Sequence, residues 1–178
     1  MTASIPAPAG YRRIREGRYR EVVGLGYPDL VEGLVIEHRP GRTVTEADNV
    51  VMTTLGGNDA PIHTDARYSA LTEWGRPLVC SSITLHIVGG MTVRSTSGLT
   101  LANLGFEEIR FTHPVFVGDT LYAETEITGR RLSQSRPDTG IVTSRTTGHN
   151  QDGKTVVTFT RSFLVPVDAD AVRDRTNY

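Results

Sequence analysis

Cysteine is almost absent from the sequence, in which Cys80 stands alone. One cysteine excludes an intrachain disulfide and is typical of proteins in a reducing compartment, so we predict a cytoplasmic location. The first ten residues lack the charged stretch followed by an apolar stretch that marks a secretory signal peptide. Apolar runs of about 20 residues, which a bilayer-spanning helix needs, are also missing, and we predict no membrane association.

An excess of charge of one sign is missing too, because 19 basic residues face 20 acidic ones and the formal net charge is −1. This balance does not favour non-specific binding to nucleic acid, so we predict no nucleic-acid partner. The sequence has no glycine-rich phosphate loop, and its histidines do not have the spacing of metal ligands. We therefore predict neither a cofactor nor a metal, and we interpret His86, in an apolar stretch, as a core residue.

The length of 178 residues suffices for one domain, and 38% hydrophobic with 22% charged residues is typical of a soluble globular protein. We predict an N-terminal arm over residues 1–33, one domain over residues 34–168 and a C-terminal tail over residues 169–178. The arm is basic and carries Arg12, Arg13, Arg15, Arg18 and Arg20. It is either a solvated, loosely packed extension or a segment that reaches a neighbouring subunit or an anionic cofactor.

The first half of the domain has the pattern of helices after a short strand at residues 34–37. Thr45 is a typical N-cap, and the helix that it begins should end at Gly56-Gly57. A second helix is predicted over residues 65–74. A third begins at Cys80 and is apolar on most faces from residue 83 to residue 93, which indicates burial. The Gly89-Gly90 pair inside it indicates a close approach of other backbone or a local break.

The second half is rich in β-branched and aromatic residues. It predicts strands over residues 104–111, 120–128, 141–149 and 155–167, with turns at residues 117–119 and 150–153. A long buried helix against an antiparallel sheet is an α+β layer fold.

The stretch from Gly56 to Asp65 places a turn, a proline, a histidine and two carboxylates within one loop. Five of its residues match the signature Gly-Asp-x-Asn-Pro-aliphatic-His-x-Asp: Gly57, Pro61, Ile62, His63 and Asp65. Further matches are Gly-x-Pro-aliphatic-Val at residues 75–79, the segment at residues 111–121 that contains Pro-Val-x-x-Gly-Asp-Thr-Leu, and the turn at residues 150–153. Over residues 34–167 the sequence resembles the MaoC-like dehydratases, the (R)-specific enoyl-CoA hydratase branch of the hotdog fold.

The resemblance implies a single hotdog domain, in which a curled antiparallel sheet wraps one long central helix. It also implies an acyl-CoA substrate and a homodimer or higher homo-oligomer, because family members bury the acyl chain near the dimer interface. Hydration of an enoyl thioester needs a deprotonated water, a proton for the α-carbon and stabilisation of the thioester oxygen. In the family an Asp and a His share the first two tasks, and a backbone N–H at the start of the buried helix performs the third.

The sequence departs from the family at three places. Asn58 stands where the catalytic Asp is expected, Ala60 replaces the family Asn, and Cys80-Ser81 replaces His-Gly. We predict His63 as general acid and base, since histidine titrates near neutral pH. Asn58 can orient a water but cannot accept its proton.

Other loop residues have alternative interpretations. Asp59 could supply the missing carboxylate, and Asp65 either caps the next helix or orients His63. The Ser81 N–H is the oxyanion-hole candidate, although Ser81 is alternatively an ordinary N-cap. Cys80 is either an activated nucleophile or an inert buried thiol.

Substrate contacts are predicted at Gly57, Pro61, Arg76 and Cys80. The phosphates of CoA need arginines, and Arg76 has rivals in Arg110, Arg130 and Arg131, all of which could instead be solvated surface residues.

The predicted function is a hydro-lyase that hydrates an enoyl-CoA or dehydrates a 3-hydroxyacyl-CoA. The Thr43–Asp48 stretch and the Asn-for-Asp pattern are most similar to mesaconyl- and itaconyl-type CoA hydratases, which implies a short branched or dicarboxylic acyl group. Two alternatives stay open. One is an acyl-CoA thioesterase that uses Asp59 or Asp65, and the other is a non-catalytic acyl-CoA-binding subunit, because the family Asp is missing.

Overall fold

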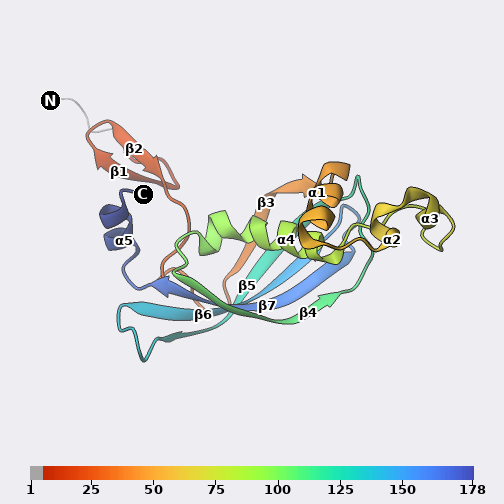
Figure 1. The fold of residues 1–178 in the computed structure, drawn as a ribbon. Helices are drawn as coiled ribbons and strands as arrows, with labels where there is room; N and C mark the ends of the chain where they lie inside the picture. Colours follow the sequence, from red (N-terminus) through yellow and green to blue (C-terminus); the bar gives the residue numbers. More distant parts are fainter. Residues whose placement is uncertain (1–5) are drawn as a thin grey trace.

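The computed structural model describes residues 6–178, and Figure 1 shows their arrangement. Residues 1–5 of the predicted arm lie outside the described residues. In chain order the elements are β1 (Tyr11–Arg15), β2 (Arg18–Glu21), β3 (Val35–Thr43), α1 (Glu46–Gly56), α2 (Pro61–Thr64), α3 (Ala66–Ala70), α4 (Ser81–Thr92), the π-helical segment η1 (Val93–Ser97), β4 (Ala102–Phe111), β5 (Thr120–Leu132), β6 (Thr139–His149), β7 (Thr155–Pro166) and α5 (Ala169–Thr176).

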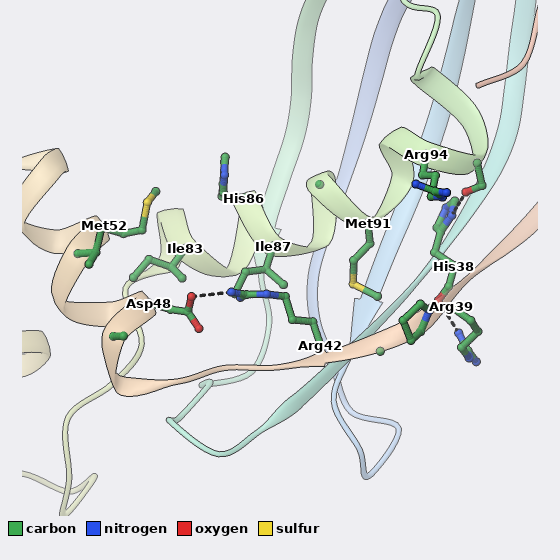
Figure 2. A pocket seen from close by; sticks show the side chains of 16 residues that line it. His38, Arg39, Arg42, Asp48, Met52, Ile83, His86, Ile87, Met91 and Arg94 are labelled. Carbon is green, nitrogen blue, oxygen red and sulfur yellow. Dashed lines mark hydrogen bonds and ion pairs between the residues drawn. The ribbon is translucent and has the colours of Figure 1, made fainter. Parts of the chain in front are cut away.

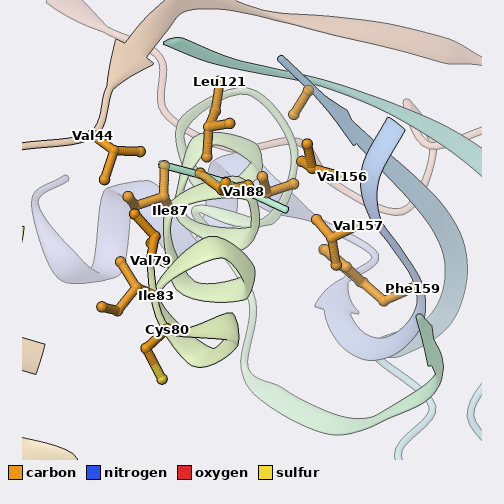
Figure 3. Close-up of a cluster of buried hydrophobic side chains, with 12 residues drawn as sticks. Val44, Val79, Cys80, Ile83, Ile87, Val88, Leu121, Val156, Val157 and Phe159 are labelled. Atoms are coloured by element: carbon orange, nitrogen blue, oxygen red, sulfur yellow. The ribbon is translucent and has the colours of Figure 1, made fainter. Parts of the chain in front are cut away.

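The central structure is a five-stranded antiparallel sheet in the order β3-β5-β6-β7-β4, with α4 lying across one face (Figure 1). The main core lies between α4 and the sheet (Figure 3), and its most buried members are Val44, Ile83, Val88, Leu121, Ala123, Val156 and Val157. Each fully buried aliphatic side chain of this size contributes about 1.5–3 kcal/mol. The α+β prediction of a sheet against one long buried helix is confirmed.

Strand β5 follows the alternation that a half-buried sheet requires. In β5, Leu121, Ala123 and Ile127 are buried, whereas Glu124 and Glu126 between them are exposed. The predicted strands of the second half all form. Strand β3 is longer than predicted and reaches Thr43, because its polar second part pairs with β5 after a register shift between His38 and Arg42. A polar stretch with an irregular register leaves no apolar alternation for sequence analysis to detect.

Helix α1 forms as predicted. Thr45 and Asp48 make a reciprocal capping box, and Gly57 ends the helix in the left-handed conformation with φ of 63°. The helix predicted over residues 65–74 forms only as the shorter α3, which ends at Ala70 and is followed by a turn, and the short helix α2 before it was not predicted. Thr72 ends α3 early, because its hydroxyl donates to the Ser69 carbonyl and so competes with the helical backbone bonds.

Two expectations about α4 are wrong. The helix runs without a break through Gly89 and Gly90, and a Cβ atom on either glycine would meet no backbone of another element within 4 Å. His86 is exposed and is not a core residue. Among residues 6–178, no helix combines the length and the apolar character needed to cross a membrane.

The arm is ordered, and its second part packs against the domain. Strands β1 and β2 form a hairpin, and the segment that follows buries Leu30 completely. The N–H groups of Gly24 and Leu25 donate to the carbonyls of Arg94 and Thr96 in η1. The expectation of a loosely packed extension is therefore wrong for this segment, while the boundaries at residues 33 and 168 remain predictions.

The predicted C-terminal tail forms helix α5, which lies beside the hairpin (Figure 1). The buried Arg173 guanidinium donates to the Gly24 carbonyl at 2.8 Å, and Arg12 pairs with Asp174 at 2.6 Å. The two ends of the described chain therefore pack on each other.

Candidate active site

His63 lies in α2, and its ring is fixed by one backbone contact. Its Nδ1 lies 3.0 Å from the Leu78 carbonyl oxygen. A carbonyl can only accept, so Nδ1 carries the proton of the neutral ring and Nε2 keeps a basic lone pair. The contact therefore selects the tautomer that a general base needs.

A cavity of about 270 Å³ opens beside this ring. Its walls come from α2, the segment before α4, the first turn of α4 and the end of β4: His63, Trp74, Leu78, Val79, Ser81, Thr84, Phe111, Thr112, His113, Pro114 and Val115. His63 and Ser81 thus lie on one cavity, although 17 residues separate them in the sequence. The space is at the small end of ligand pockets, and it suits a short acyl group.

The first turn of α4 presents backbone N–H groups near this cavity. Cys80 is the N-cap and Ser81 the first helical residue, so the alternative of Ser81 as an ordinary N-cap is wrong. Within residues 6–178, no backbone acceptor is found for the Ser81 N–H. A free N–H at the positive end of a helix dipole is suited to stabilise an oxyanion.

Asn58 contacts Cys80. Its Nδ2 donates to the Cys80 Sγ at 3.1 Å, and its Oδ1 accepts from the Ala60 N–H at 3.2 Å. Neither Asn58 nor Cys80 lines the small cavity. All three positions that depart from the family pattern therefore meet in one hydrogen-bonded group, in which Asn58 ties the loop to the start of α4.

Cys80 is buried, with 4% of its surface exposed. Burial opposes ionisation of its thiol, but the Ser82 hydroxyl and N–H, the Asn58 amide and the Ile83 N–H favour the thiolate and leave the pKa below its ordinary value.

The two aspartates of the loop lie outside the small cavity. Asp65 is the N-cap of α3 and accepts from the Tyr68 N–H at 2.9 Å, as the capping interpretation predicts. Asp59 is exposed.

The predicted substrate contacts occupy varied places. Gly57 is the C-cap that ends α1, and Pro61 is the first residue of α2, after the N-cap Ala60. Arg76 is exposed, and its guanidinium lies 3.9 Å from the centre of the Phe116 ring. Arg130 is half-buried, covers Tyr27 at 3.9 Å and donates to the Leu30 carbonyl, which gives it a structural role. Arg110 and Arg131 are exposed.

Sequence analysis missed Asn49, which is 5% exposed and contacts both His63 and Cys80. No signal in the sequence marked Asn49 as buried, because it follows Glu46-Ala47-Asp48 at the polar start of α1. It also missed a second, larger cavity of about 790 Å³ along the other side of α4 (Figure 2), lined by β3, α1, α4 and η1. Among residues 6–178, no three or more His, Cys, Asp or Glu side chains gather as metal ligands.

Comparison with known proteins decides the family. A family model described as a MaoC like domain matches residues 31–150. The chain belongs to the MaoC-like domain family. The mesaconyl-CoA hydratase of Cereibacter sphaeroides is 36% identical over 139 residues, which cover 72% of this chain and 40% of that protein. The (R)-specific enoyl-CoA hydratase of Aeromonas caviae is 30% identical over 112 residues, which cover 63% of this chain and 79% of that protein.

The hotdog prediction is confirmed by solved structures. A Mycobacterium tuberculosis protein with a double hotdog fold superposes with a TM-score of 0.76 at 27% identity, covering 83% of this chain and 46% of that one. The MaoC-like chain thus corresponds to one hotdog, and it spans about two fifths of the length of the mesaconyl-CoA hydratase.

Proposed function

We propose that this MaoC-like protein is a hydro-lyase that adds water to the double bond of an enoyl-CoA, or removes it from a 3-hydroxyacyl-CoA. One observation carries the proposal: His63 and Ser81 line the same cavity. Nε2 of His63 is free to act as a base, and the Ser81 N–H is free at the start of α4. The named activities of the two relatives support the same chemistry.

The proposed reaction uses one histidine for both proton transfers. Nε2 of His63 removes a proton from water, and the resulting hydroxide adds to the β-carbon of the enoyl thioester. The electron pair of the double bond moves to the thioester oxygen, where the Ser81 N–H stabilises the enolate. The imidazolium of His63 then returns its proton to the α-carbon.

The remaining site residues act from outside the small cavity. Asn58 bonds Cys80, so we assign it to holding the loop against the start of α4 in place of the water-orienting role expected from the sequence. Asp65 positions His63 indirectly by capping α3. Asp59 is assigned as the loop carboxylate that replaces the missing family Asp. Arg76 is assigned to the phosphates of CoA, while Gly57, Pro61 and Cys80 hold the loop and the start of α4 that carry His63 and Ser81. The free thiol of Cys80 fits the proposed cytoplasmic location.

The proposed substrate carries a short branched or dicarboxylic acyl group. Similarity to a mesaconyl-CoA hydratase favours this class, and a cavity of about 270 Å³ holds few carbon atoms beyond the thioester.

The proposed assembly is a homodimer through β4. This edge strand exposes Leu104, Phe106, Ile109 and Phe111, an apolar row that is unusual for an edge in water. Phe111 also lines the small cavity, so a partner on β4 would help to enclose the substrate. The match to one half of a double hotdog supports a second copy as that partner.

A direct test follows the loss of enoyl-thioester absorbance with mesaconyl-, itaconyl- and crotonyl-CoA. The wild type should hydrate at least one of them, and equal rates for wild type and His63→Ala would overturn the assignment. Release of free CoA thiol without change at the double bond would identify a thioesterase. Saturable binding without turnover would identify a non-catalytic subunit.

A further inference from the structure

Asn49 joins the two halves of the candidate site. Its Nδ2 donates to the His63 carbonyl at 2.9 Å and lies 3.4 Å from the Leu78 carbonyl. Its Oδ1 accepts from the Cys80 N–H at 3.1 Å. One carboxamide therefore bonds the helix that carries the base, the strand-like segment before α4, and the N-cap of α4.

The place of Asn49 in α1 makes this connection rigid. The side chain is 5% exposed, and the Asn49 carbonyl accepts from the Thr53 hydroxyl at 2.7 Å. Helix α1 is itself fixed by its capping box at one end and by Gly57 at the other. A buried carboxamide with its donors and its acceptor engaged holds its partners at fixed separations.

The contacts bear on the two groups that the chemistry needs. The Leu78 carbonyl, which Asn49 approaches, is the same oxygen that receives the His63 Nδ1–H and so selects the basic Nε2. Asn49 also takes the Cys80 N–H as a donor, which leaves the next N–H, that of Ser81, as the free donor at the helix start.

We propose that Asn49 is a positioning residue that sets His63 and the Ser81 N–H at their working separation. This proposal rests on the proposed function, and Asn49 does not itself touch substrate. The role requires an amide in particular, because it must donate to carbonyls and accept from an N–H at once. Aspartate can only accept when ionised, and leucine can do neither.

The test compares Asn49→Ala with Asn150→Ala in turnover of the thioester on which the wild type is active. Asn150 is a matched control, because it is 6% exposed and its Oδ1 accepts two backbone N–H groups in the β6–β7 turn. Misplacing reacting groups by about 1 Å lowers rates by about 100-fold, so Asn49→Ala should lower kcat by about 10- to 100-fold. KM should stay within about threefold, and Asn150→Ala should lose less than about threefold in kcat. An equal loss of kcat in both variants would overturn the proposal.

A second readout does not need turnover. Nitrogen-15 NMR should show the Nδ1–H tautomer for His63 in the wild type and in Asn150→Ala, and a shift toward the Nε2–H tautomer in Asn49→Ala. An unchanged tautomer in Asn49→Ala overturns the proposal. If the wild type hydrates no thioester, the proposed function fails, and the NMR comparison alone decides the role of Asn49.

Thermal melting shows whether each variant is folded. Should Asn49→Ala not fold, Asn49→Asp preserves the side-chain volume and the acceptor for the Cys80 N–H. It should still lose the tautomer preference and at least about tenfold in kcat. Wild-type kcat and tautomer in Asn49→Asp would overturn the proposal.

Discussion

The two sides of α4 differ in how their polar groups are used. On the larger cavity (Figure 2), Arg42 pairs with Asp48 at 2.6 Å, Arg39 pairs with Glu37, and both ring nitrogens of His38 are hydrogen-bonded. On the smaller cavity, His63 uses one ring nitrogen and keeps the other, and the Ser81 N–H has no backbone acceptor within residues 6–178. The volume of a cavity therefore does not indicate whether its polar groups are free to react. The three arginines of the larger space are paired with carboxylates and its buried histidine is hydrogen-bonded, with the exposed His86 as the exception, whereas the smaller space holds groups kept available.

The largest expected effect comes from replacing the histidine on each side of α4 by glutamine, in two separate variants. His63→Gln should lower kcat/KM for the enoyl thioester by about 100- to 10,000-fold, because it removes the general base. His86→Gln, on the exposed side of α4 that faces the larger cavity, should stay within about twofold of wild type. A comparable loss in both variants would erase the distinction between the two cavities.

The second-largest expected effect comes from removing one backbone N–H, that of Ser81. Ser81→Pro deletes the N–H at the first helical position, where proline is well tolerated, and Cys80 already has the extended conformation (φ −61°, ψ 136°) that precedes proline. Loss of one oxyanion donor should lower kcat by about 100- to 1000-fold. Ser81→Ala keeps the N–H and should remain near wild type. A loss of activity in Ser81→Ala would instead assign the role to the hydroxyl.

A third prediction concerns stability on the larger side. Burial first, and the charge of Arg39 second, lower the pKa of His38 to about 4 from its ordinary 6.5. Between these values the unfolded chain binds a proton that the folded chain does not, so stability falls as pH falls through this window. From pH 7.5 to pH 5 the His38 share of this loss should be about 2 kcal/mol.

Urea unfolding at the two pH values measures the effect. In His38→Gln this share should disappear, because glutamine does not titrate. An identical acid sensitivity of wild type and His38→Gln would show that His38 is not held neutral.

The smallest effect tests whether the paired charges matter to stability. Arg42→Gln should cost less than about 1 kcal/mol in urea unfolding at pH 7, because Arg42 is half-exposed and solvent screens the pair. The Arg42 hydrogen bond is the main reason that the pKa of Asp48 is lowered to about 2, so this pKa should rise in the variant. Arg39→Gln breaks the more exposed pair with Glu37 and should cost less still. Equal costs would place both pairs in the same environment.

Local chemistry explains what the sequence could predict. The N-cap Thr45, the helix end at Gly56-Gly57 and the strand that begins at Thr120 are set by neighbouring residues, and each forms as predicted. The motif at residues 75–79 likewise placed the start of the buried helix at Cys80. Contacts between residues far apart in the sequence could not be predicted. The polar half of β3 depends on its partner β5, and the value of Asn49 depends on three backbone groups that come together only in the folded chain.

The contact between arm and tail has a consequence for the order of folding. Arg173 reaches the Gly24 carbonyl across 149 positions of sequence, and Arg12 reaches Asp174 across 162. Such a closure carries a large entropy loss unless the intervening sheet has already brought the ends together. During synthesis, the β1–β2 hairpin must therefore wait for α5 to leave the ribosome before the two can dock. The hairpin and α5 should form one late cooperative unit, whose amide hydrogens exchange together and before those of the sheet.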